Sequence, residues 1–247
     1  MKLKLLDLFS GIGGFSLGLE STGFFETIAF VEKDKFCQKV LKKNFKNITI
    51  EGDIRNVKGS NYKADVITGG FPCQPFSGAG KRKGTDDDRY LWDETIRVVR
   101  ECKPRWFIGE NVEGIINIQD GMVLKKVCDD LEKEGFEVQC LIIPASSIGA
   151  FHQRKRVWII AYSKHNGLYR KKGNETIKSL NQSEEWIFIR DNWKKNKSEF
   201  LRINDGLSSK LDKDRTNRIK SLGNSIVPFI ARELGLAIMK AELDETR

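Results

Sequence analysis

Near its start the chain passes from an apolar run directly into a glycine-rich turn, Leu3-Lys4-Leu5-Leu6-Asp7-Leu8-Phe9-Ser10-Gly11-Ile12-Gly13-Gly14. Residues 2–9 have the pattern of a buried strand, and the residues after Gly14 have that of a helix ending before Gly23. Glycines at such a turn let the backbone approach a ligand closely, and the helix N-terminus favours polar or anionic groups. Glycine-rich turns also occur without a ligand. The stretch therefore predicts an α/β fold first and a ligand site second.

The alternation of strand and helix continues to about residue 162. Further strands are predicted at 27–31, 48–50, 64–68, 106–108, 138–143 and 157–162. Helices are predicted after an N-cap at Asp34, at 91–102, at 122–134 and at 223–241. This order predicts a mostly parallel, doubly wound sheet. Residues 163–217 are polar and basic and interrupt the alternation, which indicates a small second region.

Composition indicates an ordinary globular protein. The chain has 247 residues, of which 39% are hydrophobic and 31% charged, enough for one large domain or one domain and a small one. We find no apolar run long enough to span a bilayer, and the N-terminal segment is too short for a signal peptide. The five cysteines and two histidines do not form a zinc pattern. Reduced thiols and a cytoplasmic location are expected.

The positive charge is unevenly distributed. The net charge is +9, and residues 164–220 contain 15 Lys and Arg against 8 Asp and Glu, which is seven of these nine charges. A basic region of this kind suits a polyanion. A lysine-rich, solvated surface is the alternative.

A second turn presents a cysteine between two prolines, Phe71-Pro72-Cys73-Gln74-Pro75-Phe76-Ser77. It follows the strand predicted at 64–68, so it belongs at the carboxyl edge of the sheet, where open α/β folds bind ligands. The prolines fix φ and stiffen the turn. A rigidly presented thiol is suited to nucleophilic catalysis. The alternative is a structural turn with a small buried cysteine.

Two carboxylates complete the pattern of a nucleoside pocket. Glu32 ends the second strand, the place from which an acidic residue binds ribose hydroxyls. Asp53 follows the third strand and is suited to accept from an exocyclic amine. The full dinucleotide spacing is missing, which favours S-adenosyl-L-methionine over NAD.

Five blocks now stand in order along the chain. They are residues 7–14, 69–77, 110–112 (Glu-Asn-Val), 154–157 (Arg-Lys-Arg-Val) and 218–228, which includes Gly223-Asn224-Ser225. Together they resemble the ordered motifs of the DNA (cytosine-5)-methyltransferases, over residues 1–162 and about 215–241. The resemblance implies a Rossmann-like, S-adenosylmethionine-dependent fold. It further implies a catalytic and cofactor-binding domain at 1–162, a target-recognition region at 163–217, and a segment at 218–247 that returns to the catalytic domain.

The resemblance also implies a reaction. The methyl group of S-adenosyl-L-methionine would go to carbon 5 of a cytosine flipped out of double-stranded DNA, leaving S-adenosyl-L-homocysteine and requiring no metal. Cys73 would attack carbon 6 as the thiolate and form a covalent adduct. Glu110 would donate to ring nitrogen 3 through a carboxyl with a raised pKa. Arg156 would contact the base oxygen, and Arg154 would hold nearby groups or phosphate.

Binding residues follow from the same resemblance. Those expected to hold the cofactor are Phe9, Ser10, Gly11, Gly13, Glu32, Asp53, Ile54, Pro75, Leu91, Asn224 and Ser225. Those expected to contact DNA are Ser77, Lys81, Arg82, Lys83, Arg89, Arg190 and Arg202. The basic run 77–90 would close over DNA as a mobile loop, and an ordinary surface loop is the alternative.

The sequence departs from the family pattern at one place and leaves other functions open. His152 stands where the family often has glutamine, and Gln153 is shifted by one position. An RNA cytosine methyltransferase is disfavoured because its Cys-Phe-Thr signature is missing. A non-catalytic DNA-binding protein is disfavoured by Cys73, Glu110 and Arg156, and an NAD oxidoreductase ranks lower still. A monomer is expected from the family's habit, with a cognate restriction endonuclease as an open possibility.

Overall fold

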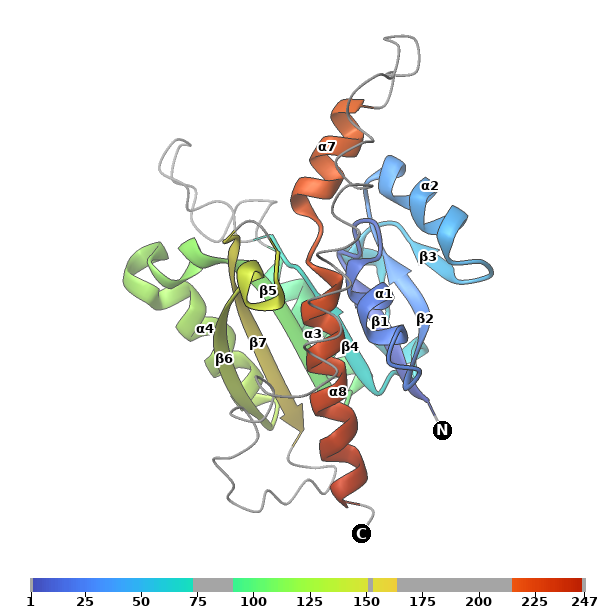
Figure 1. Cartoon of the computed structure of the whole chain (residues 1–247). Helices are drawn as coiled ribbons and strands as arrows, with labels where there is room; N and C mark the ends of the chain where they lie inside the picture. The colour runs from blue at the N-terminus through green and yellow to red at the C-terminus, as the bar shows by residue number, and fades with distance from the viewer. Residues whose placement is uncertain (1, 73–90, 151–152, 164–214, 246–247) are drawn as a thin grey trace.

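The computed structural model describes residues 2–72, 91–150, 153–163 and 215–245, and within them a seven-stranded sheet with the order β3-β2-β1-β4-β5-β7-β6. Its strands are β1 (Leu3–Leu8), β2 (Phe25–Val31), β3 (Thr49–Glu51), β4 (Val66–Gly69), β5 (Trp106–Val112), β6 (Phe136–Pro144) and β7 (Lys155–Ser163). The first five pair in parallel, whereas β7 pairs antiparallel with both β5 and β6. The prediction of a mostly parallel, doubly wound α/β fold is confirmed (Figure 1).

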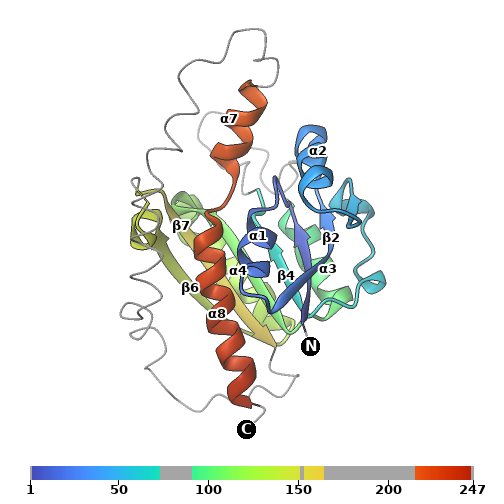
Figure 2. The ribbon, with the colours of Figure 1, turned by 45° about the vertical axis from the view of Figure 1, so that its right-hand side comes forward.

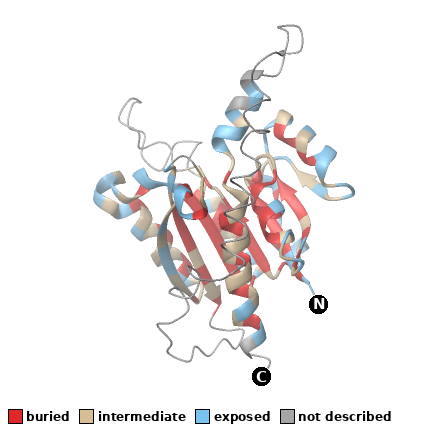
Figure 3. Cartoon of the chain, viewed as in Figure 1, coloured by how far each residue is buried: buried red, intermediate tan, exposed pale blue. Residues whose placement is uncertain are grey.

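Helices cover both faces of the sheet (Figures 1 and 2). They are α1 (Gly14–Glu20), α2 (Lys35–Asn44), α3 (Trp92–Cys102), α4 (Met122–Lys133), α7 (Arg215–Asn224) and α8 (Pro228–Glu245). Side chains of α1 and α8 share one buried cluster with Leu3 and Leu5 of β1. Side chains of α3 and α4 share the other with Leu6 and Leu8. Because β1 is buried on both faces, it reads in the sequence as a nearly continuous apolar run (Figure 3).

The C-terminal helix returns to the first helix of the chain. A Cβ atom added at Gly18 of α1 would lie 2.1 Å from the carbonyl oxygen of Pro228 and 2.8 Å from the Cβ of Ala231 in α8. Only a residue without a side chain permits this approach. The first and last helices therefore pack backbone against backbone.

The C-terminal segment differs from the single helix predicted at 223–241. Helix α7 ends at Asn224 and α8 begins at Pro228. Proline suits the first turn of a helix, but it disfavours helical backbone in the residue before it. The break at 225–227 follows from that restriction.

By length and composition alone this segment could cross a membrane, which differs from the prediction that the chain has no apolar run long enough to span a bilayer. The range Lys220–Leu243 has a mean hydropathy of 1.3 in its most apolar window. A third of that window is buried, and Ile230, Ala231 and Ile238 belong to the core cluster shared with α1.

Candidate active site

The glycine turn lies where the sheet order reverses. β1 has β2 on one side and β4 on the other, so the carboxyl ends of β1 and β4 flank the switch point at which open α/β folds bind ligands. Phe9 and Gly11 both have positive φ, 51° and 56°. The Ser10 hydroxyl donates to the Asp7 carbonyl at 2.5 Å and accepts from the Val31 amide at 3.2 Å. These bonds tie the turn to the ends of β1 and β2.

Glu32 lies directly against this turn. Its carboxylate accepts from the amide of Gly11 at 2.7 Å and from that of Asp34 at 2.7 Å. Burial raises its pKa, while the amide hydrogen bonds oppose that rise. Asp34 is the N-cap of α2, as predicted, and accepts from the amides of Phe36 and Cys37.

Asp53 has a different environment from Glu32. Its carboxylate caps the short helix η1 (Ile54–Asn56) and pairs with Arg55 at 2.9 Å and Lys33 at 3.4 Å. The hydrogen bond from Arg55 holds its pKa well below the usual range. Both carboxylates follow the ends of adjacent strands, β2 and β3.

Apolar residues predicted to line the cofactor site share one cluster. Ile54 is buried in it, and Phe9 and Leu91 pack against it. They come from the turns after β1 and β3 and from the start of α3. All three residues therefore belong to the same large core cluster, on the face of the sheet that α3 and α4 cover.

The C-terminal block reaches the start of α1. A Cβ atom added at Gly14 would lie 2.9 Å from the Ser225 hydroxyl oxygen and 2.8 Å from Cγ1 of Ile226. Asn224 is exposed at the end of α7. Ser225 thus lies beside the helix that follows the glycine turn.

The buried Glu110 forms an ion pair with the partly exposed Arg156. Glu110 lies inside β5, which extends beyond the predicted 106–108 because its pairing with β7 continues to Val112 opposite Arg156. Nε of Arg156 lies 3.0 Å from Oε1 of Glu110, and Glu110 is 8% exposed. Burial raises the Glu110 pKa, and Arg156 and then Arg154 oppose that rise.

The neighbouring Asn111 holds the segment that leads to Cys73. Its Nδ2 donates to the carbonyl of Phe71 at 2.9 Å, and its Oδ1 accepts from the Val112 amide at 2.9 Å. Phe71 is buried and comes two residues before Cys73 in the sequence. The Glu-Asn-Val block thus carries both a carboxyl and a backbone clamp. Several predicted site residues lie outside the described residues: Cys73, Pro75, Ser77, Lys81, Arg82, Lys83, Arg89, Arg190 and Arg202.

Arg154 binds backbone carbonyls. Its Nη1 donates to Gly223 O at 2.6 Å and its Nη2 to Ser225 O at 2.8 Å. Within the described part of the chain, Arg154 Nε and Trp158 Nε1 are buried without a hydrogen-bond partner. Burial lowers the pKa of Arg154.

Sequence reasoning missed Asp7 as part of the site. Its fully buried carboxyl accepts from the hydroxyls of Ser16 at 2.9 Å and Thr68 at 2.8 Å. Burial raises its pKa to about 7. The three residues link β1, α1 and β4 beneath the glycine turn. An acidic residue within an apolar strand was the available signal.

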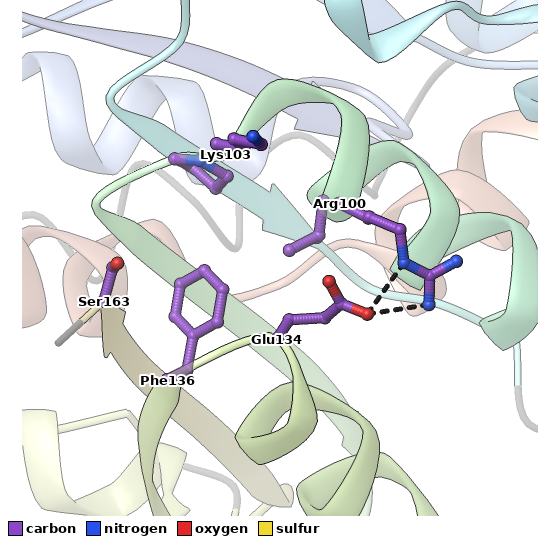
Figure 4. Close-up of a pocket in the computed structure, with 7 residues that line it drawn as sticks. Arg100, Lys103, Glu134, Phe136 and Ser163 are labelled. Carbon is purple, nitrogen blue, oxygen red and sulfur yellow. Dashed lines mark hydrogen bonds and ion pairs between the residues drawn. The ribbon is translucent and has the colours of Figure 1, made fainter. Parts of the chain in front are cut away.

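A pocket of about 340 Å³ lies at the other end of the sheet, beside the start of β5 (Figure 4). Phe136 and Ser163, which line it, stand at the start of β6 and the end of β7. Its lining includes the Arg100–Glu134 ion pair and none of the predicted site residues. Among the residues described here, no group of three His, Cys, Asp or Glu side chains could hold a metal ion.

Comparison with known proteins agrees with this geometry. A family model described as C-5 cytosine-specific DNA methylase matches residues 3–233. The Type II methyltransferase M.Bsp6I of Bacillus sp. (strain RFL6) is 37% identical over 164 residues, covering 65% of this chain and 52% of its own. M.AquIA of Picosynechococcus sp. is 36% identical, covering 65% of this chain and 72% of its own. In M.Bsp6I and in two further Type II methyltransferases, M.FnuDI and M1.ScrFI, the match spans about half of the relative's length.

Solved structures give the same result. One, described as a DNA modification methyltransferase encoded within a prophage (E. coli), superposes with a TM-score of 0.59 at 29% identity, covering 69% of this chain and 49% of its own. A mutant of Spodoptera frugiperda DNMT2 superposes with a TM-score of 0.59 at 25% identity, covering 70% of this chain and 54% of its own.

Proposed function

The chain belongs to the C-5 cytosine-specific DNA methylase family, and we propose that it methylates carbon 5 of cytosine in double-stranded DNA with S-adenosyl-L-methionine as methyl donor. The observation that carries this proposal is the Glu110–Arg156 pair, 3.0 Å apart, beside the Asn111 clamp on Phe71. These residues lie at the carboxyl end of β5, next to the exit of β4 that leads in sequence to Cys73.

The residues at the glycine turn fit the cofactor. A Cβ atom added at Gly11 would have no neighbour within 4 Å, so the turn borders open space. Glu32 supplies carboxylate oxygens for ribose hydroxyls, and Phe9, Ile54 and Leu91 supply an apolar wall. When bound, S-adenosyl-L-methionine supplies an electrophilic methyl group.

The side chains of this protein would activate the base. A thiolate at Cys73 attacks carbon 6 of the cytosine, and Glu110 in its protonated form donates to nitrogen 3. Once carbon 5 carries the methyl group, its proton leaves to a base such as water, and the bond from carbon 6 to sulfur breaks, which restores the aromatic ring and the Cys73 thiolate. Burial favours that protonated form, which supports the role. Arg156 supports negative charge on the base oxygen while it keeps Glu110 in place. The base must be flipped out of the duplex, since its carbon 5 and carbon 6 are not reachable in the stack.

The proposed activity also implies binding partners. Double-stranded DNA is the proposed substrate, and the basic residues between 164 and 220 suit its phosphates. The relatives named Type II methyltransferases support pairing with a cognate restriction endonuclease. A cytoplasmic location fits an enzyme that acts on DNA with reduced thiols.

Methyl transfer from labelled S-adenosyl-L-methionine to unmethylated genomic DNA tests the proposal, with bisulfite sequencing of the product. We expect label at cytosine carbon 5 in one short sequence context and none with Cys73→Ser. A protein that binds the cofactor but labels no DNA would contradict the proposal, and the same assay on RNA would then identify an RNA substrate.

A further inference from the structure

Arg154 connects two parts of the chain that are distant in sequence. It lies just before β7 and two residues before Arg156, and its guanidinium reaches carbonyls 69 and 71 residues further along. Between those points the chain leaves β7 at Ser163 and returns in α7. Arg154 therefore ties the start of β7 to the point where the chain returns to the catalytic domain, whereas the other end of that segment leaves β7 at Ser163, at the far end of the strand.

The chemistry of this contact is that of a helix C-cap. The last carbonyls of a helix have no partner within the helix and carry its negative dipole end. Gly223 is in the last turn of α7, and Ser225 follows the helix directly. A guanidinium presents several donors in a rigid fork, so one arginine can bind both carbonyls.

The same junction also packs closely against the start of α1. The space that a Cβ atom at Gly14 would need is filled by Ser225 and Ile226, so the junction cannot move toward the glycine turn without a clash. Arg154 also lies close enough to Glu110 for its positive charge to oppose the rise in the Glu110 pKa that burial causes. The ion pair of Glu110, however, is with Arg156. Arg154 thus spans the distance between the C-terminal junction and the acidic centre of the site.

We propose that Arg154 is a positioning residue that clamps the junction between α7 and α8 to the start of β7, and so fixes Ser225 relative to the Glu110–Arg156 pair. Its link to catalysis rests on the proposed function, whereas the clamp itself does not. In this role Arg154 acts through the carbonyls of Gly223 and Ser225 and needs no contact with the base or a DNA phosphate.

Amide hydrogen exchange of residues 215–227 is the direct test, with Arg154→Met and Arg154→Lys compared with the wild-type chain. Methionine keeps most of the length but donates no hydrogen bond, so we expect exchange there to rise by roughly tenfold or more. Lysine has one flexible ammonium group and should restore part of the protection. Lys155→Met is the matched control, since Lys155 is half exposed and pairs with Glu113 at 3.7 Å. Circular dichroism verifies that each variant is folded, and the lysine variant carries the test if the methionine variant is not.

Kinetics and binding separate positioning from direct contact. A clamp on Ser225 predicts a raised KM for S-adenosyl-L-methionine and weaker binding of S-adenosyl-L-homocysteine, with a smaller effect on kcat at saturating substrates. Unchanged amide exchange of residues 215–227 in Arg154→Met would overturn the proposal. A hundredfold fall in kcat would instead indicate direct contact with the base. A fall of about one in the salt slope of DNA binding would indicate a lost phosphate contact. If the wild-type chain methylates no DNA, exchange and cofactor-product binding still decide whether the clamp exists.

Discussion

At the scale of single residues, the site depends on carboxyl groups that burial has shifted toward the neutral form. Glu110 is the one that we propose donates to the base. Glu110→Gln keeps the size and a donor group but cannot transfer a proton, so we expect methyl transfer to fall by roughly a hundredfold or more. The measurement is kcat under saturating cofactor and DNA, with cofactor-product binding as the control for folding.

The pH dependence of the same reaction gives an independent check. Activity of the wild-type enzyme should decline as pH rises through the raised pKa of Glu110, because the ionised carboxylate no longer donates. The Gln variant should lack this decline. An unchanged rate in Glu110→Gln would remove the carboxyl from the mechanism.

Asp7 should make folding stability depend on pH. Its pKa in the folded chain is raised to about 7 from 3.8. The folded state therefore holds a proton that the unfolded state has released between these values, and stability falls as pH rises from about 4 to 7. The full effect is at most about 4 kcal/mol. In Asp7→Asn this slope should be missing, which denaturant midpoints at several pH values will show. Identical slopes in both chains would mean that Asp7 is ionised when folded.

At the scale of helices and strands, the contact between α1 and α8 allows a matched pair of glycine substitutions. Gly18→Ala places a methyl group 2.1 Å from a backbone oxygen, so the helices must separate, at a cost of about 1–3 kcal/mol. Gly223→Ala in α7 meets nothing within 4 Å and should be neutral or stabilising by up to ~1 kcal/mol. Urea unfolding of both variants measures the difference. Equal effects would show that α1 and α8 are not in close contact.

Helix α4 and strand β6 bring two thiols together. The sulfur atoms of Cys128 and Cys140 lie 3.6 Å apart, and Cys140 is exposed. A two-electron oxidant such as a diazene should convert the pair to a disulfide while the diazene is reduced to a hydrazine. Closing so short a loop should stabilise the fold by up to ~3 kcal/mol. Peptide mapping without reductant measures the link, with Cys140→Ser as control. Preferential modification of Cys37 or Cys102 instead would contradict the arrangement.

Sequence patterns predicted most of these elements because the signals are local. The buried strands are continuous apolar runs, and Asp34 caps α2 by bonding the next amides in the chain. Pairing between distant segments has no such local signal. The antiparallel register of β5 with β7, which places Arg156 near Glu110, and the carbonyl partners of Arg154 appear only once the sheet is assembled. The break before Pro228, by contrast, does have a local signal, because proline disfavours helical backbone at residue 227.

At the scale of the whole molecule, α8 runs along one face of the sheet, from the carboxyl ends of the parallel strands to their amino ends. Near its start it packs on α1, beside the glycine turn, and near its end Glu242 accepts from Trp106 Nε1 at 2.7 Å and pairs with Arg105. Trp106 opens the strand whose other end carries Glu110. The described residues should therefore unfold as one cooperative unit rather than as a sheet with a detachable helix.

Substitutions of Glu242 test whether the described residues unfold cooperatively. Glu242→Gln keeps an acceptor for the indole and loses only the charge opposite Arg105, which is partly exposed, so we expect a loss of about 1 kcal/mol. Glu242→Ala leaves the buried indole N–H without a partner and should cost about 2–3 kcal/mol. Tryptophan fluorescence reports the buried core through Trp92 of α3, Trp106 of β5 and Trp158 of β7, once Trp186 and Trp193 have been replaced by phenylalanine in every chain compared. Far-UV circular dichroism reports the helices. In both variants the two signals should shift together to lower urea, because an anchor at one end of α8 stabilises the packing at the other. A helical transition that precedes the fluorescence change would mean that α8 unfolds alone, and the active site would then sit in a sheet that is stable without its C-terminal helix.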